Sequence, residues 1–171
     1  AGTPILTGDF CGSEDFSSSE LTSSYSDGSF IGNDGVTWSY TASRDENGDA
    51  NGSGIDGKAI MLRRVEDNSK VLSSAVSGGI ADFSVKLYKG FTGGGDRQVE
   101  LFVNGVSQGV TDAFDYFDEH IFEVNGINIS GDVSIEIRNI TPKQVIVDNI
   151  AWTCAGFDCP ILEANIGDSC D

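Results

Sequence analysis

The chain has 171 residues, of which 39% are hydrophobic, so its composition excludes a disordered segment and fits one domain with a single core. Its net charge is −17, from 27 acidic and 10 basic residues. This charge disfavours nucleic acid as a partner unless the basic residues gather on one face. No run approaches 18 apolar residues, so the sequence predicts no membrane-spanning helix.

Short runs in which apolar and polar residues alternate recur along the chain, a pattern typical of β-strands with one buried face. The polar segment 17–29 precedes them and is expected to be a surface connection. No segment has the 3.6-residue period of a helix. The predicted strands are 36–42, 58–64, a weaker one at 70–77, 81–90, 97–105, 119–126, 132–140 and 144–153.

The turns between these strands are rich in Gly, Asn and Asp, and Asn104-Gly105 predicts a tight hairpin because both central residues of such a turn need positive φ. The sequence therefore predicts an all-β fold, an antiparallel β-sandwich of the jelly-roll type with about eight strands. The pattern fails after residue 153. We expect a β-sandwich binding module over 1–153 and a Cys-containing linker, or the start of a further module, over 154–171.

Alternation also assigns faces to the strands. In "ADFSVKLYKG", Phe83, Val85 and Leu87 are expected to point into the core. Lys86 and Tyr88 are expected on the opposite face, either exposed or lining a concave surface.

Four cysteines lie near the two ends of the chain, at Cys11, Cys154, Cys159 and Cys170. Their spacing matches no zinc motif, and His120 is the only histidine. Three disulfide pairings are possible, of which we favour Cys11–Cys154 with Cys159–Cys170. The alternative is four free thiols. Disulfides imply an oxidising compartment, and we expect a secreted protein. The chain begins at Ala1, without Met or a signal peptide, as expected of a mature fragment or an excised module.

The stretch "RDENGDANGSGIDGK" contains an oxygen-rich loop with the ligand spacing of an EF-type calcium loop. Ala50 stands where such a loop needs Gly, its last position is an Asp instead of a Glu, and no helix flanks it. We therefore favour a turn without calcium and leave a second metal site there open. The ligand-spaced residues are Asp45, Asn47, Asp49, Asn51, Ser53 and Asp56.

A second candidate metal site joins the two ends of the domain. Asp148 interrupts an apolar run, and a buried carboxylate needs a partner. Because the first and last strands of a sandwich commonly lie side by side, Glu14 can approach Asp148, with Asp27 and Asp34 from a Gly-broken loop. These four residues predict a structural Ca²⁺ site. The alternative places Asp148 on a solvent face or at a backbone turn.

The sequence offers little catalytic chemistry. A single histidine and the absence of nucleophile, P-loop and metalloprotease motifs weaken an enzyme assignment. The best acidic cluster, "FDYFDEH" at 114–120, is expected to be a polar loop with aromatic anchors. A carboxylate pair of the glycosidase type remains an alternative.

Several segments together show a resemblance: "SYSDGSFIGNDGVTWSY", "IDGKAIMLR", "FSVKLYKGFTGGGDRQVELFVNG" and "VIVDNIAW", with Glu14 and Phe16 before them. Over residues 13–153 the chain resembles the jelly-roll accessory modules of secreted multidomain proteins from marine Bacteroidetes, which accompany polysaccharide-degrading enzymes and some extracellular nucleases. Calcium-stabilised jelly-roll carbohydrate-binding modules hold Ca²⁺ between an early Glu and a late Asp, which implicates Glu14 and Asp148. The resemblance implies a binding module and does not name its ligand.

Sugar recognition uses flat aromatic rings, and Arg is favoured where the sugar carries sulfate or carboxylate, because its planar fork binds bidentately. The "AIMLRR" pattern puts Arg63 and Arg64 on opposite faces, and Trp38 has a core position as its alternative. The loop 89–97 is predicted to be either a flexible rim over a glycan or a loose hairpin. The candidate carbohydrate-binding residues are Trp38, Tyr40, Arg44, Arg63, Arg64, Lys86, Tyr88 and Arg97.

The sequence thus predicts a non-catalytic, monomeric, calcium-stabilised module that binds an algal polysaccharide, anionic or sulfated, beside other modules of a parent chain. This holds only if the ten basic residues concentrate at the site. One alternative is an interaction or spacer module of a secreted nuclease or adhesin without glycan affinity. The other is a small polysaccharide lyase or hydrolase.

Overall fold

The structure is a computed structural model that describes residues 10–47, 55 and 57–155. Eleven β-strands and two short 3₁₀ turns make up the described part. The strands are β1 (Phe10–Glu14), β2 (Ser26–Ile31), β3 (Thr37–Asn47), β4 (Lys58–Leu62), β5 (Lys70–Ser73), β6 (Phe83–Lys89), β7 (Val99–Val103), β8 (Val106–Val110), β9 (His120–Val124), β10 (Ile135–Asn139) and β11 (Val145–Thr153), and the 3₁₀ turns are η1 (Asn33–Gly35) and η3 (Val65–Asp67).

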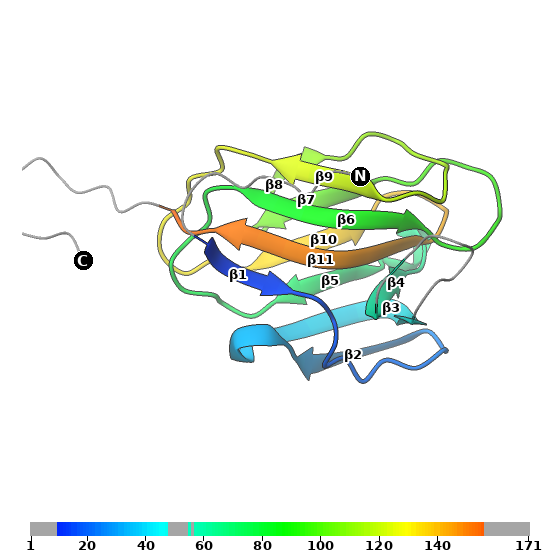
Figure 1. The fold of residues 1–171 in the computed structure, drawn as a ribbon, viewed down its shortest axis with the longest axis horizontal. Coiled ribbons are helices and arrows are strands. Elements are labelled where there is room, and N and C mark those ends of the chain that lie inside the picture. The colour runs from blue at the N-terminus through cyan, green and yellow to red at the C-terminus, as the bar shows by residue number, and fades with distance from the viewer. Residues whose placement is uncertain (1–9, 48–54, 56, 156–171) are drawn as a thin grey trace, which may run out of the picture.

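All the strand pairs are antiparallel, in the order β8-β7-β10-β5-β3-β4-β11-β6-β9, with β2 added to β3 and β1 to β11. The sheet folds over on itself, so β9, β6, β11 and β4 form one layer and β8, β7, β10 and β5 the other (Figure 1). The all-β prediction is confirmed, and the two predicted sheets are joined through one strand.

That shared strand is β3. Its first half pairs with β5, with Trp38 opposite Ser73, and its second half pairs with β4, with Ser43 opposite Leu62. Between the halves, Ala42 has a φ of 46°, in the left-handed region that non-glycine residues rarely adopt. The chain changes direction there and passes from one layer to the other.

The last strand, β11, is the centre of the second layer. It pairs with β6 along one edge, and with β4 and then β1 along the other, where Glu14 lies opposite Ile150. The expected adjacency of the first and last strands is confirmed. So is the Cys11–Cys154 disulfide, which fastens β1 to the residue that follows β11. The predicted Cys159–Cys170 pair lies outside the described residues.

The core lies between the two layers. Phe83, Val85 and Leu87 are fully buried there, as predicted. The two tryptophan rings, Trp38 and Trp152, meet edge to face with their centres 6.4 Å apart. Every one of these side chains belongs to a single cluster of buried residues.

Two strands, β2 and β8, are not predicted by the alternating pattern. The segment 17–29, predicted to be a surface connection, overlaps the edge strand β2, whose residues are exposed except for Phe30. The hairpin predicted at Asn104-Gly105 is confirmed, with φ values of 51° and 77°. Its second strand, β8, was not predicted because its residues are mostly polar or exposed.

No helix in the described part is long and apolar enough to cross a membrane.

Candidate functional site

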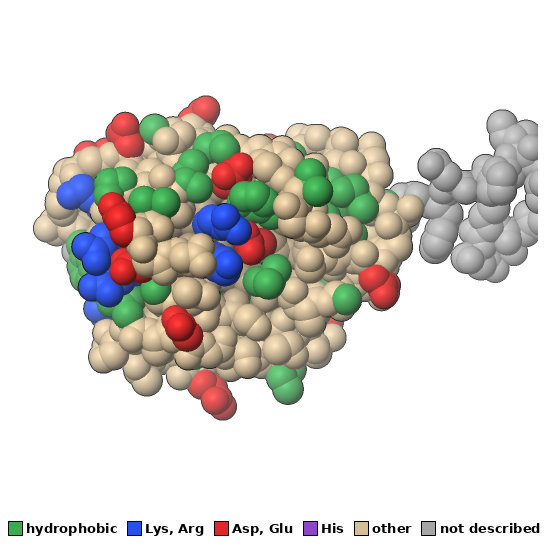
Figure 2. All heavy atoms as spheres, turned by 180° about the vertical axis from the view of Figure 1, so that it is seen from behind, with side chains coloured by type: hydrophobic (Ala, Val, Ile, Leu, Met, Phe, Trp, Pro, Cys, Tyr) green, Lys and Arg blue, Asp and Glu red, His purple; other side chains and the backbone are tan. Residues whose placement is uncertain are grey.

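The positive charges of the chain gather at one end of the sandwich. Figure 2 shows Lys and Arg side chains concentrated at the end where β6 finishes and β11 begins. Six of the ten basic residues lie there, and we call this region the basic end. Its basic residues are Arg44, Arg63, Arg64, Lys89, Arg97 and Lys143.

The centre of the basic end is an aromatic ring close to two guanidinium groups. The guanidinium carbons of Arg44 and Arg63 lie 5.8 and 5.0 Å from the centre of the half-buried Tyr25 ring. The Tyr25 hydroxyl donates to the Met61 sulfur at 3.5 Å. Arg44 also lies 5.5 Å from the ring centre of Phe91, which is 40% exposed. Flat rings beside guanidinium groups can stack on a sugar and bind its anionic groups.

Arg64 joins this group through a shared carboxylate. The Asp67 carboxylate lies 3.5 Å from Arg63 Nε and 3.0 Å from Arg64 Nε, and both arginine side chains remain about 40% exposed. The prediction that the two arginines point to opposite faces is therefore wrong. The strand β4 ends at Leu62, so the alternation of faces no longer applies to Arg63 and Arg64.

Arg97, predicted to bind carbohydrate, is fully buried. Its guanidinium donates to the carbonyl oxygens of Gly90, Gly95 and Gln144 at 2.8, 2.6 and 3.1 Å, and to the Asp115 carboxylate at 2.9 Å. It thus ties the loop that carries Phe91 to the start of β11. Arg97 supports the basic end from below and does not belong to its surface.

The same carboxylate holds a second basic residue. The Lys89 ammonium lies 2.6 Å from Asp115 and 4.9 Å from the centre of the Phe117 ring. The Gly95 N–H, and after it the Lys89 and Arg97 cations, hold the pKa of Asp115 below its usual range. Asp115 belongs to the acidic stretch 114–120, so this carboxylate serves as an anchor for loops.

Lys86 and Tyr88 meet on the outer face of β6. The Lys86 ammonium is 3.2 Å from the Glu119 carboxylate, which also accepts a hydrogen bond from the Tyr88 hydroxyl at 3.1 Å. Burial, then Glu119, raises the pKa of Tyr88. The predicted face is confirmed. The side chain of Tyr88 is nevertheless only 4% exposed, because it packs with Met61, Ile146 and Ile55.

Two predicted aromatic platforms lie elsewhere. Trp38 is fully buried in the core, so the structure supports its alternative core position and removes it from the surface. Tyr40 is partly buried beside Phe30, 6.4 Å between ring centres, and covers Gly28 at the β2–β3 edge. Sequence reasoning missed Tyr25 and Phe91. The signal available for each was a single aromatic residue in a polar or Gly-rich segment.

Of the four predicted metal ligands, three accept backbone N–H groups and the fourth is exposed. Both Glu14 oxygens accept backbone N–H groups, from Phe16 at 2.7 Å and Asn33 at 2.9 Å, and burial raises the pKa of this carboxyl. Asp148, also buried, accepts the N–H of Asn149 at 2.8 Å. Asp27 accepts the N–H of Ala42, and Asp34 is exposed.

Among the described residues, no three His, Cys, Asp or Glu side chains form a group suited to a metal ion. Asp45 lies in β3, where burial raises the pKa of its carboxyl, and Asn47 is the last residue of that strand. The remaining positions of the EF-type spacing, Asp49 to Asp56, lie outside the described residues. The calcium requirement stays a prediction.

No protein-family model and no curated protein matches the chain. Among solved structures, a family 6 carbohydrate-binding module matches with a TM-score of 0.53 at 14% identity, over 89% of this chain and 99% of that one. The chain has the fold of carbohydrate-binding modules. A family 36 module in complex with calcium and xylotriose matches with a TM-score of 0.50 at 18% identity, over 67% of this chain and 92% of that one.

A larger protein also matches. A family 43 arabinoxylan arabinofuranohydrolase from Bacillus subtilis, in complex with cellotetraose, gives a TM-score of 0.52 at 11% identity. The match covers 80% of this chain and 28% of the hydrolase, so the chain spans less than a third of that enzyme's length.

Proposed function

We propose that the chain is a secreted, non-catalytic carbohydrate-binding module that takes an anionic polysaccharide, of the sulfated or carboxylated kind found in algae, at its basic end. One observation carries the proposal: the guanidinium groups of Arg44 and Arg63 lie over Tyr25 and Phe91, with Arg64 beside them, in a chain whose net charge is −17. The rest of the surface repels polyanions, so the basic end is where one can dock.

The fold supports the same class of function. Two of the similar structures are carbohydrate-binding modules, and each is covered along nearly its whole length. The Cys11–Cys154 disulfide supports an oxidising, extracellular setting. The carboxylates of Asp115 and Glu119 are held in ion pairs with Lys and Arg side chains, which favours binding over hydrolysis.

Calcium is part of the proposal as a stabilising ion. The family 36 module in the comparison is itself a complex with calcium. In this chain Glu14 is the residue best placed for such a role, since it is a buried carboxylate at the end of β1 that also binds the η1 turn through the Asn33 N–H. Thermal unfolding of the chain in CaCl₂ and in EDTA tests the requirement. Equal midpoints would remove calcium from the proposal.

The binding test is affinity electrophoresis in gels that contain agar, porphyran, carrageenan, fucoidan, alginate or laminarin. We expect retardation in at least one gel with a charged polysaccharide and none in laminarin, which is neutral. Arg44→Gln and Arg63→Gln should each weaken binding about tenfold or more, as expected for loss of a hydrogen bond to a charged group.

Arg138→Gln is the matched control. Arg138 is also partly exposed, but its partners are Glu136 and the Phe102 ring on the outer face of β10, and not the rings of the basic end. Its replacement should leave retardation unchanged. If no gel retards the chain, the spacer interpretation replaces this one. If Arg138→Gln weakens binding as much as Arg44→Gln, the ligand binds elsewhere.

A further inference from the structure

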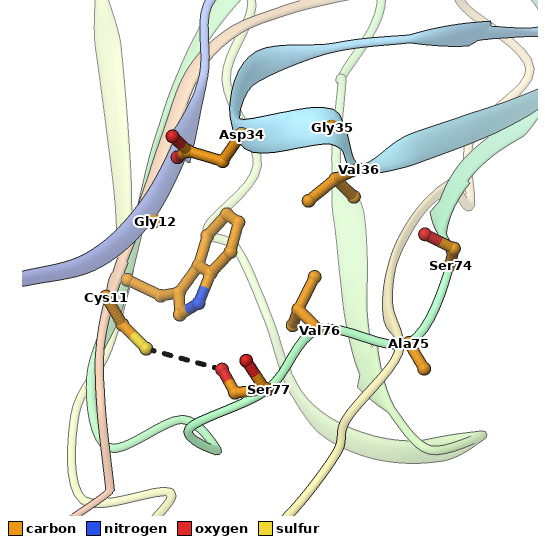
Figure 3. A pocket seen from close by; sticks show the side chains of 10 residues that line it. Cys11, Gly12, Asp34, Gly35, Val36, Ser74, Ala75, Val76 and Ser77 are labelled. Atoms are coloured by element: carbon orange, nitrogen blue, oxygen red, sulfur yellow. Dashed lines mark hydrogen bonds between the residues drawn. The ribbon is translucent and has the colours of Figure 1, made fainter.

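The opposite end of the sandwich contains a hollow of about 210 Å³ beside the disulfide. Its walls come from β1, the η1 turn, β11 and the segment after β5. Figure 3 shows the Asp34 side chain over Gly12 on one side and Val36 and Val76 facing each other across the hollow. The lining residues are Cys11, Gly12, Asp34, Gly35, Val36, Ser74, Ala75, Val76, Ser77 and Trp152.

The walls are fixed by backbone bonds. Ser74 N–H donates to the Thr37 carbonyl at 2.7 Å, and Val76 and Val133 exchange two bonds at 2.8 and 2.9 Å. Cys11 is held by its disulfide to Cys154, and its sulfur lies 3.6 Å from the Ser77 carbonyl oxygen as a contact without a proton to donate. The hollow is therefore preformed.

Its floor is the Trp152 ring. This side chain is 2% exposed, and its indole nitrogen, like that of Trp38 in the core, is buried without a hydrogen-bond partner among the described residues. Trp152 therefore contributes an apolar ring to the hollow and not a donor. Gly12 is required here, because a Cβ on it would come within 2.3 Å of the Trp152 ring.

The other residues that line the hollow determine which kind of ligand fits it. Among the described residues that line the hollow, none is basic, and Asp34 is an exposed carboxylate. The Ser74 oxygen accepts the Thr37 N–H, so its own proton is available to donate, and Ser77 adds a second hydroxyl. Two valines and an indole ring supply the apolar part. Such a lining repels sulfate and carboxylate and suits vicinal hydroxyl groups on a hydrophobic ring.

We propose that this hollow is a second carbohydrate site that takes a single uncharged pyranose. Asp34 accepts hydrogen bonds from two hydroxyl groups, the Ser74 hydroxyl donates to a sugar oxygen, and Val36, Val76 and the Trp152 ring contact the C–H face. The volume equals that of about seven water molecules, at roughly 30 Å³ each, and fits one sugar ring. This site includes no residue of the basic end. It favours an uncharged ligand, whereas the basic end favours an anionic one.

The test follows the two indole N–H signals of the ¹⁵N-labelled chain by NMR during titration with D-galactose, D-xylose or D-galacturonate. The titrations are run in EDTA and repeated in CaCl₂. We expect the Trp152 signal to shift saturably with galactose or xylose, the Trp38 signal to stay in place, and galacturonate to bind at least about tenfold more weakly. Calcium should change neither result.

Asp34→Asn tests the carboxylate. Asp34 has a φ of 56°, a conformation that Asn tolerates well, so the variant keeps the turn. It should weaken sugar binding about tenfold. Glu123→Gln, an exposed neutralisation on β9, is the control and should change nothing.

A Trp152 signal that does not move with either neutral sugar overturns the proposal. So does equal binding of galacturonate, or binding that requires CaCl₂. Arg44→Gln should leave this titration unchanged while it weakens retardation in the polysaccharide gels, so failure of one site is distinguished from failure of the other.

Discussion

The buried Arg97 shows how one side chain organises two loops. It donates four hydrogen bonds, three to backbone carbonyl oxygens and one to the Asp115 carboxylate. We expect Arg97→Met to lower the free energy of unfolding by about 3–5 kcal/mol, the cost of breaking a buried ionic network. Arg138→Met, at a partly exposed pair, should cost about 1 kcal/mol or less. Urea unfolding measures both, and similar losses would show that Arg97 has no special role.

His120 gives a pH dependence that can be assigned to one group, since the chain has no other histidine. Its ring stacks on Phe114 with centres 4.5 Å apart and contacts the hydroxyls of Thr111 and Tyr116. Burial lowers the pKa of His120 below 6.5, against the opposing charge of Asp112.

The unfolded chain therefore binds a proton at a higher pH than the folded one. Stability contributed by the neutral ring is present above pH 6.5 and is lost as the pH falls from there toward the folded pKa. We expect the unfolding midpoint to drop more between pH 7.5 and 5.5 in the wild type than in His120→Gln. NMR titration of the ring should give a pKa below 6.5. Parallel pH profiles of the two proteins would contradict this.

At the scale of elements, the turn of β3 between layers depends on Asp27. Its carboxylate accepts the N–H of Ala42, the residue with positive φ, at 2.7 Å. We expect Asp27→Ala to cost about 0.5–1.5 kcal/mol, the usual value of one hydrogen bond, and to cost the same in CaCl₂ and EDTA. Glu20→Ala, which removes an exposed carboxylate from the same connection, is the control. A loss confined to CaCl₂ would instead make Asp27 a calcium ligand.

The elements also show what the sequence could predict. Alternation found the strands with one buried face, such as β7, because a period of two records burial directly. It missed β2, since an edge strand with one buried residue has no alternation to record. The arginines of the basic end were found by residue type. Their grouping around Tyr25 was not, because it depends on contacts between segments that are 19 and 38 residues apart in sequence.

Across the whole molecule, salt acts on stability and on polysaccharide binding in opposite directions. With 27 acidic and 10 basic residues, the folded chain repels itself, and salt screens that repulsion. We expect the unfolding midpoint to rise as NaCl increases from about 10 mM to 150 mM, while affinity for a charged polysaccharide falls. Sugar binding in the hollow should not change. Stronger polysaccharide binding in salt would contradict the assignment to the basic end.

The disulfide described above also determines where a longer polypeptide enters and leaves such a module. The Cα atoms of Cys11 and Cys154 are 4.7 Å apart, on neighbouring antiparallel strands. A polypeptide that continues past both residues enters and leaves at nearly the same point. Residues 11–154 therefore add almost no distance between whatever precedes and follows them, whereas an extended spacer adds about 3.3 Å per residue. A module joined to neighbours at both positions would project sideways from them, with the basic end on the side away from the join.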